Sequence, residues 1–298
     1  MTNRLYCAFS YECNNNCLHC AADSEKQRNL SLSIEDIERL LKKIDEMKDV
    51  EVELSGGEPT LKPELYYFLA RLTESHPEIK HVLLTNGRTF SNPNNAAKLS
   101  EYNPYSIFVP LHADTRELHD KISGAKNSFD ETMLGLKNMY EYRLPVNIKT
   151  VVNKLNYQRM PNLVEMVAQT LPECKWITLN GLELSGRALK NKDMLGIRIS
   201  DTKTHIEKAI DMANKYGLRI ATYSIPPCIL SKDYWKYVGR KRRNVIITKT
   251  PTTDMKRVEL TYGTVPECKE CRFFNGCTGA WYSYFEVYGK DELKPVIK

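Results

Sequence analysis

Hydrophobic and polar positions follow two alternating patterns along the first two thirds of the chain. Short apolar runs with many β-branched residues predict buried strands. These runs cover residues 5–10, 50–55, 81–85, 106–111, 146–152 and 175–179. Between them, apolar residues recur with the helical period, most clearly after Ser33, a candidate helix N-cap with Asp36 three residues on. Further amphipathic stretches cover residues 63–75, 129–142, 160–171 and 202–216.

The repeated strand–helix order predicts a parallel sheet, because each crossover must return the chain in the same direction. A complete barrel of eight such units takes about 250 residues. The six units found here therefore predict an α/β fold with a partial, open (β/α)6 barrel of the TIM type. In such a barrel the chemistry is expected in the loops that follow the strands.

The pattern changes after Gly217. Residues 218–222 predict one short strand, and residues 245–249 and 257–261 predict a hairpin. From Cys228 on, cysteines, glycines and aromatic residues replace the strand–helix rhythm. We therefore expect a barrel domain over residues 1–217 and a small cysteine-rich α+β domain over residues 218–298.

Composition places the protein among ordinary globular chains. Hydrophobic residues make up 42% of its 298 residues and charged residues 27%. No apolar run is long enough to cross a bilayer and the N-terminus does not resemble a signal peptide, so we expect a cytoplasmic protein without a membrane partner. The net charge of +6 does not by itself indicate a nucleic-acid partner, and no RNA-binding module is visible.

Nine cysteines are many for such a chain, and seven of them fall into two tight groups. The odd total and this clustering argue against a secreted disulfide framework and favour metal binding. The other two, Cys7 and Cys174, lie in or next to predicted strands. We expect both to be buried core residues.

The first group, Cys13-Asn-Asn-Asn-Cys17-Leu-His-Cys20, directly follows the first strand. Three thiolates so close together can hold one metal centre. Zinc usually takes four ligands, and His19 is expected to be poorly placed to share a metal with its neighbour Cys20. A cube of four irons held by three cysteines instead leaves one iron open, where a chelating cofactor can bind.

Cys-x3-Cys-x2-Cys after the first strand of a partial barrel resembles the radical S-adenosylmethionine (SAM) superfamily. The resemblance implies a 4Fe–4S cluster on Cys13, Cys17 and Cys20, with SAM chelating the open iron. It also implies that reductive cleavage of SAM yields a 5′-deoxyadenosyl radical, which abstracts hydrogen from a substrate.

The segment after the second strand, Gly56-Gly57-Glu58-Pro59, resembles the superfamily's GGEP motif, whose backbone and Glu contact the SAM amino group. Glycines allow the main chain to approach a ligand closely, and a carboxylate attracts an ammonium group. On its own, the same string is an ordinary turn.

The later strand ends carry further SAM contacts by the same resemblance. Asn86 is expected near the SAM carboxylate or ribose, and His112 near the ribose. Asn153 and Leu182 match regions that hold ribose and adenine, and Arg187 is a candidate for the methionine carboxylate. The alternatives are turns at Asn86 and Asn153, a structural histidine, and a solvated arginine.

The second group comprises Cys228, Cys268, Cys271 and Cys277. Four thiolates can close either a tetrahedral zinc site or a 4Fe–4S cluster. The arrangement resembles the shortened SPASM, or twitch, extension of radical SAM enzymes, which implies one auxiliary 4Fe–4S cluster. Spacing alone does not separate iron from zinc.

The resemblance favours an oxidoreductase or maturase that modifies a peptide or protein side chain, supplied with electrons by a flavodoxin or ferredoxin. Dehydrogenation or rearrangement of a small metabolite is the alternative, with RNA a less favoured substrate. A non-catalytic zinc or iron–sulfur binding protein is the alternative of a different class.

The basic run Arg240–Arg243 is interpreted either as a solvated loop or as a docking patch for an acidic peptide leader or RNA. The sequence does not identify the residue that quenches the substrate radical.

Overall fold

One curved sheet organises the chain, as a computed structural model shows. The structure describes residues 3–27, 29–47, 49–240, 245–249, 252–257 and 262–297. Of the basic run expected to be a loop or a docking patch, residues 241–243 lie outside the described residues.

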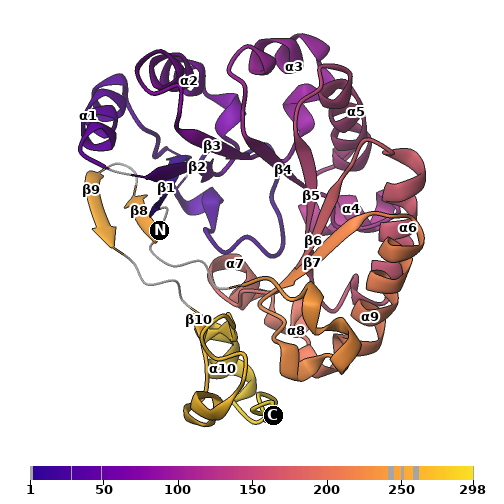
Figure 1. The fold of residues 1–298 in the computed structure, drawn as a ribbon. Coiled ribbons are helices and arrows are strands. Elements are labelled where there is room, and N and C mark those ends of the chain that lie inside the picture. The colour runs from indigo at the N-terminus through magenta and orange to yellow at the C-terminus, as the bar shows by residue number, and fades with distance from the viewer. Residues whose placement is uncertain are drawn as a thin grey trace.

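Seven parallel strands form the main part of the sheet, and each pairs with the next along the chain. They are β1 (Asn3–Ser10), β2 (Val50–Gly56), β3 (Lys80–Leu84), β4 (Ser106–Pro110), β5 (Val146–Val152), β6 (Trp176–Gly181) and β7 (Arg219–Tyr223). The sheet curves around an interior without closing (Figure 1). The partial barrel predicted from the sequence is thus confirmed, with β7 as a seventh parallel strand.

Helices pack on the outer face of the sheet (Figure 1). They are α1 (Ile34–Asp45), α2 (Glu64–Ser75), α3 (Pro93–Ser100), α4 (Arg116–Ser123), α5 (Ser128–Glu141), α6 (Met160–Thr170) and α9 (Ile199–Lys215). Two short helices, α7 (Gly186–Lys190) and α8 (Lys192–Leu195), follow β6, and α7 lies on the inner side of the curved sheet (Figure 1). The Ser33 hydroxyl accepts the Asp36 N–H at 3.2 Å and the Asp36 carboxylate accepts the Ser33 N–H at 3.0 Å, which confirms the predicted cap of α1. None of the described helices has the length and apolar character needed to span a membrane.

Two further strands extend the sheet beyond β1. β8 (Val245–Lys249) pairs in parallel with β1, and β9 (Thr252–Arg257) pairs antiparallel with β8. The predicted hairpin is present, but its second strand is not the predicted 257–261: it begins at Thr252, because β-branched threonines suit a strand as well as a turn. The sheet also continues past Gly217 into β7, and the proposed division of the chain there stays a prediction.

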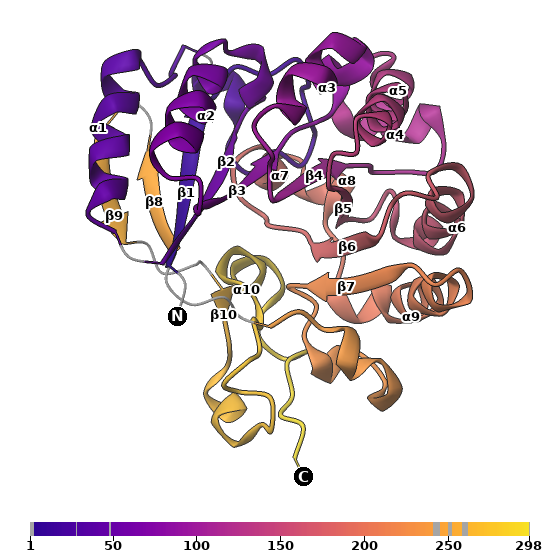
Figure 2. The same ribbon diagram turned by 45° about the horizontal axis from the view of Figure 1, so that its top comes forward.

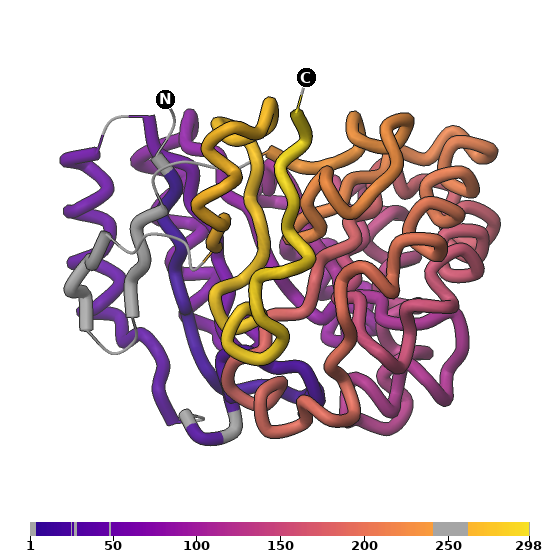
Figure 3. Tube along the Cα trace, turned by 90° about the horizontal axis from the view of Figure 1, so that it is seen from below, coloured from indigo at the N-terminus to yellow at the C-terminus, as the bar shows by residue number. Residues whose placement is uncertain are grey.

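The C-terminal segment lies in the gap between β7 and β8, on the open side of the barrel (Figures 1 and 2). It contains β10 (Tyr262–Gly263), β11 (Ala280–Trp281) and α10 (Tyr282–Tyr288), and β10 and β11 form a small antiparallel sheet. Seen from below, the last part of the chain runs across this opening (Figure 3).

Trp281 connects the C-terminal segment to the barrel. Its indole N–H donates to the carbonyl of Gly181 at 3.0 Å, and its ring centroid lies 4.1 Å from that of Tyr262. The Tyr284 hydroxyl adds a second connection by accepting the backbone N–H of Ile199 at 3.0 Å. The segment is therefore joined to the end of β6 and to the start of α9.

We predict that Trp281→Phe loosens this connection while the aromatic contact with Tyr262 is kept. Losing one partly buried hydrogen bond costs about 1 kcal/mol. Amide hydrogen exchange of residues 277–288 should accelerate about fivefold, with little change in α6. Equal acceleration throughout the barrel would contradict a local role for the indole N–H.

Candidate functional site

The first cysteine group forms an irregular loop directly after β1, here called the cysteine loop (residues 13–20). All three thiols are partly exposed and none forms a disulfide. Burial raises the pKa of the Cys13 thiol to about 11, and burial also raises that of Cys17, with Cys13 and Cys20 as charged neighbours. The three thiols therefore lie near one another, and a metal would stabilise the buried Cys13 and Cys17 as thiolates.

Short contacts between β2 and the chain leading into the cysteine loop fix its first cysteine. The Gly57 N–H donates to the Ser10 carbonyl at 2.5 Å, and the Glu58 N–H donates to the Glu12 carbonyl at 2.7 Å. A Cβ atom at Gly56, where φ is 128°, would lie 2.1 Å from the Ser10 oxygen, and one at Gly57 would lie 2.3 Å from the Glu12 oxygen. Any larger residue at position 56 or 57 would therefore clash with the backbone before Cys13, so both positions require glycine.

Glu58 is fully buried and accepts four hydrogen bonds from its own chain. Oε1 accepts from the Thr60 N–H (3.1 Å) and hydroxyl (2.6 Å) and from the Thr85 hydroxyl (2.7 Å), and Oε2 accepts from the Asn86 N–H (2.6 Å). The carboxylate therefore joins the ends of β2 and β3. Pro59 is buried beside it at the start of a short 3-10 turn. Contacts of Glu58 and Pro59 with SAM stay predictions.

The end of β3 contacts the asparagines between the cysteines. The Asn86 amide donates to Asn14 Oδ1 at 2.6 Å and lies 4.0 Å from Cys13 Sγ. Arg88 donates to the Asn14 carbonyl and, at 2.8 Å, to Asn15 Oδ1, while its Nε binds Glu131 at 2.7 Å. Asn86 thus lies at the cysteine loop, and its contact with SAM stays a prediction. Sequence reasoning missed Arg88 and the asparagines, although three consecutive asparagines between cysteines were the available signal.

Arg187 fixes the other end of the cysteine loop. Its guanidinium donates to Asn16 Oδ1 and to the Cys17 carbonyl at 3.3 Å, and it lies 3.5 Å from the Asp23 carboxylate. Its backbone N–H donates to the Cys20 carbonyl at 2.9 Å. With 9% of its surface exposed, Arg187 is not a solvated arginine, and its contacts are with the protein.

The cysteine loop also has backbone partners at the end of α4. The N–H groups of Asn16 and Leu18 donate to the carbonyls of Ser123 and Ile122, both at 2.9 Å. The side chain of Asn191 donates to the Leu18 carbonyl at 3.0 Å. A loop without regular secondary structure is thus hydrogen-bonded to three different parts of the barrel: the end of β3, the end of α4, and α7 with its C-cap Asn191.

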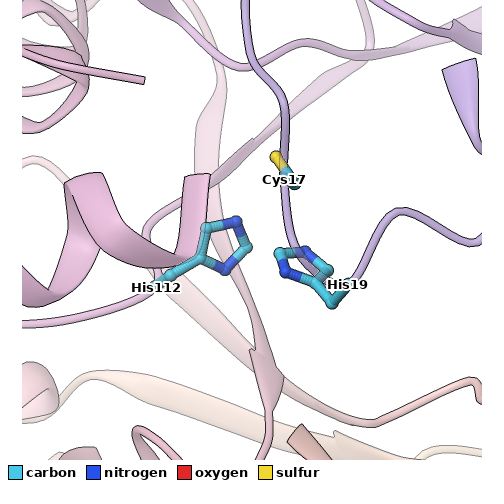
Figure 4. A group of neighbouring side chains, drawn as sticks. All are labelled: Cys17, His19 and His112. Atoms are coloured by element: carbon cyan, nitrogen blue, oxygen red, sulfur yellow. The ribbon is translucent and has the colours of Figure 1, made fainter. Parts of the chain in front are cut away.

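His112, at the end of β4, lies against the cysteine loop. Its ring centroid is 4.4 Å from that of His19 and 5.6 Å from that of His119. One donor atom each of Cys17, His19 and His112 lies within 4.8 Å of the others (Figure 4). Burial lowers the pKa of His19 to about 4 and that of His112 well below its usual value, so both rings are neutral at pH 7. His19, expected to be poorly placed beside Cys20, instead lies beside Cys17.

Asn153 and Leu182 occupy the ends of β5 and β6. Asn153 is fully buried, and its side chain accepts the Leu155 N–H at 2.9 Å and donates to the Val151 carbonyl at 3.2 Å, so it forms the alternative turn. Leu182 lines a mostly apolar cavity. The cavity is lined by Val152, Gly181, Leu182, Leu184, Ile197, Ile199, Thr202, Ile225 and Tyr284. Contacts of Asn153 and Leu182 with SAM stay predictions.

The second cysteine group also comes together. Cys228, Cys268, Cys271 and Cys277 line one cavity, although the first follows β7 and the others belong to the C-terminal segment. Burial and the three neighbouring thiols raise the pKa of Cys277 to about 11. Backbone N–H groups point at two of the sulfurs, from Gly279 to Cys277 at 3.2 Å and from residue 296 to Cys271 at 3.4 Å. These are features of a thiolate metal site.

The two cysteines outside these groups are buried, as predicted. Cys7 has no exposed surface and Cys174 has 6%. Both belong to the main hydrophobic core.

Comparison with known proteins decides the family. Residues 8–167, which include the cysteine loop and the Gly-Gly-Glu-Pro segment, match the radical SAM superfamily. The chain belongs to this superfamily. Membership implies a SAM-binding 4Fe–4S cluster, and three thiols preformed at the mouth of the barrel fit that group.

Several relatives share this region. A Saccharolobus islandicus protein named "Probable GTP 3′,8-cyclase" is 32% identical over 204 residues, which cover 67% of this chain and 63% of that protein. The mycofactocin maturase MftC of Mycolicibacterium smegmatis is 27% identical over 161 residues, covering 54% of this chain and 40% of that protein. The chain thus spans less than two thirds of the length of these relatives.

A solved structure extends the likeness to the C-terminal segment. Streptococcus suis SuiB bound to its precursor peptide SuiA superposes with a TM-score of 0.70, covering 99% of this chain and 75% of that one at 16% identity. At this identity the comparison shows a shared fold.

We predict that Arg187→Gln loosens the cysteine loop in the metal-free protein. Removing a buried, charged hydrogen-bonding group costs roughly 1.5–3 kcal/mol. The amides of Asn16, Leu18 and Cys20 should therefore exchange tenfold faster or more, and iron uptake on reconstitution should fall. Arg198→Gln is the control, because Arg198 is a partly exposed arginine that pairs with Asp291 at 3.5 Å and Glu292 at 3.9 Å, outside the cysteine loop. Equal exchange rates in both variants would rule out the role given to Arg187.

Proposed function

We propose that this radical SAM protein holds a 4Fe–4S cluster on Cys13, Cys17 and Cys20, cleaves SAM reductively and abstracts hydrogen from a peptide or protein side chain. The cysteine loop is the observation that supports the cluster and the cleavage of SAM. It supplies three thiols, and a 4Fe–4S cluster with three protein ligands leaves one iron open for SAM. When bound there, the reduced cluster supplies the electron that cleaves SAM to methionine and a 5′-deoxyadenosyl radical.

The protein's own residues provide position. The backbone contacts of Gly57 and Glu58 fix the chain before Cys13, and Arg187 fixes it at Cys17 and Cys20. The Asn86 amide nitrogen lies 4.0 Å from Cys13 Sγ at the end of β3, where it could contact a ligand of the open iron. The neutral rings of His19 and His112 fill the space beside Cys17 without adding positive charge.

A second cluster is proposed on Cys228, Cys268, Cys271 and Cys277. Four thiols lining one cavity, two of them receiving backbone N–H groups, support a fully ligated 4Fe–4S cluster. Such a cluster suits electron transfer or support of the substrate cavity. Structural zinc is the alternative, and metal analysis separates the two.

Two substrate classes have support from the comparisons. A peptide substrate is supported by the likeness to SuiB, which was solved with its precursor peptide, and by the maturase MftC. A small molecule is supported by the relative named as a GTP cyclase. We favour the peptide, because the likeness to SuiB includes the C-terminal segment beside the open side of the barrel. An acidic one-electron carrier such as flavodoxin or ferredoxin is the proposed electron donor.

We predict that anaerobic reconstitution yields about eight irons per chain, or about four if the C-terminal site holds zinc. With dithionite, the loaded protein should produce 5′-deoxyadenosine from SAM. The triple variant Cys13→Ala, Cys17→Ala, Cys20→Ala should lose this product entirely. Cys7→Ala is the matched control, because Cys7 is a core cysteine outside both groups. Continued cleavage by the triple variant would sink the cluster assignment.

The substrate class can be read from the hydrogen that the radical takes up. We predict that a perdeuterated peptide, encoded by a short open reading frame beside the gene, transfers deuterium to 5′-deoxyadenosine. Perdeuterated GTP should transfer none. Mass spectrometry of the 5′-deoxyadenosine reports both results, and deuterium from GTP alone would reverse the choice of substrate.

A further inference from the structure

Two histidines from different parts of the chain meet at one cysteine. His19 belongs to the cysteine loop and His112 follows β4, and their rings approach each other edge to face at 4.4 Å. Their donor atoms and the sulfur of Cys17 lie within 4.8 Å of one another (Figure 4). This group of metal-ligating side chains shares Cys17 with the three cysteines and adds two histidines to it.

The two histidines keep unused ligand atoms. Nδ1 of His19 and Nδ1 of His112 are both buried and have no hydrogen-bond partner among the described residues, and His112 is only 2% exposed. An unsatisfied buried polar atom destabilises the fold, so a bound cation that accepts these nitrogens as ligands would relieve that cost.

The neighbouring His119 shows the contrast. Its Nδ1 accepts the backbone N–H of His112 at 3.2 Å, and its Nε2 lies 3.2 Å from the Ser128 hydroxyl. Both nitrogens are therefore used, which marks His119 as a structural residue. His19 and His112 are instead equipped to bind something further.

We propose that, in the cluster-free protein, Cys17, His19 and His112 bind one zinc ion, with the fourth position open to water. One thiolate and two imidazoles are a common zinc ligand set, and tetrahedral Zn–N and Zn–S bonds of about 2.0–2.3 Å place the ligand atoms roughly 3.3–3.6 Å apart. Zinc binding therefore requires side-chain rotations that bring the three ligand atoms closer than the 4.8 Å within which they now lie.

Sharing Cys17 has a consequence for cluster assembly. A zinc ion that occupies Cys17 removes one of the three thiolates that the 4Fe–4S cluster needs, so zinc and the cluster exclude each other. Zinc bound only by Cys13, Cys17 and Cys20 would have the same effect, but it would not need the histidines. The two arrangements therefore respond oppositely to substitution.

The test is zinc binding to metal-free, reduced protein under anaerobic conditions, with a chromophoric chelator as competitor. In every protein compared, the four C-terminal cysteines are replaced by Ser, so that they hold no zinc. The parent protein with only these replacements should bind one zinc at this site. His112→Ala and His19→Ala should each weaken binding tenfold or more, whereas Cys13→Ala/Cys20→Ala should retain it. His76→Ala is the matched control, because His76 pairs at the surface with Asp45.

A second measurement does not depend on how well the variants fold. Cobalt(II) bound to protein with an intact cysteine loop should show a thiolate-to-cobalt absorption with the intensity of one thiolate rather than three. Three-thiolate intensity, or wild-type affinity in a folded His112→Ala variant, would overturn the proposal. Zinc-loaded protein should also fail to take up iron until a chelator is added. These readouts involve no SAM cleavage, so their failure leaves the proposed function standing, and the converse also holds.

Discussion

The structure depends on how the cysteine loop satisfies its backbone. Residues 13–20 form no helix or strand, so their polar groups need partners elsewhere in the protein. The partners are backbone groups at the end of α4 and the side chains of Arg88, Arg187 and Asn191, while Gly57 and Glu58 hold the chain just before the loop. Because these contacts come from separate strand–helix units, the loop takes its shape only when the barrel is assembled.

Charge is the second constraint on both cysteine groups. Burial raises the pKa of Cys13 and Cys277 to about 11, so without a metal these thiols stay protonated at pH 7. A metal centre supplies the positive charge that the thiolates need, and the N–H groups aimed at Cys13, Cys271 and Cys277 supply the rest. Both sites are therefore shaped by the fold and completed by the metal.

The sequence predicted the barrel well because its signals are local. Strand and helix periodicity, the Ser33–Asp36 cap and the cysteine spacing each depend on residues near one another in the chain. The sequence did not predict contacts between residues that are far apart in the chain. Nothing around Arg187 shows that its partner is Asn16, and nothing around His112 shows that it meets His19. The hairpin boundary was misplaced because Thr252 and Thr253 suit a turn and a strand alike.

The glycine motif shows the same limit of prediction from local sequence. Glycine at 56 and 57 predicts a close approach, and the structure shows a close approach to the carbonyls of Ser10 and Glu12, while contact of the two glycines with SAM stays a prediction. A glycine in the sequence indicates that another group lies close to the backbone, but it does not show whether that group is a ligand or another part of the protein.

The thiols of the cysteine loop can serve more than one kind of metal centre. Cys17 has two sets of possible co-ligands. Cys13 and Cys20 provide soft thiolates, which suit an iron–sulfur cluster, and His19 and His112 provide imidazoles, which suit zinc. The fold does not separate these sets, since His19 lies within the cysteine loop and His112, after β4, lies against that loop. Selection between the metals must therefore come from the order of supply and from SAM, which adds ligands to an open iron and has none to offer the histidine site.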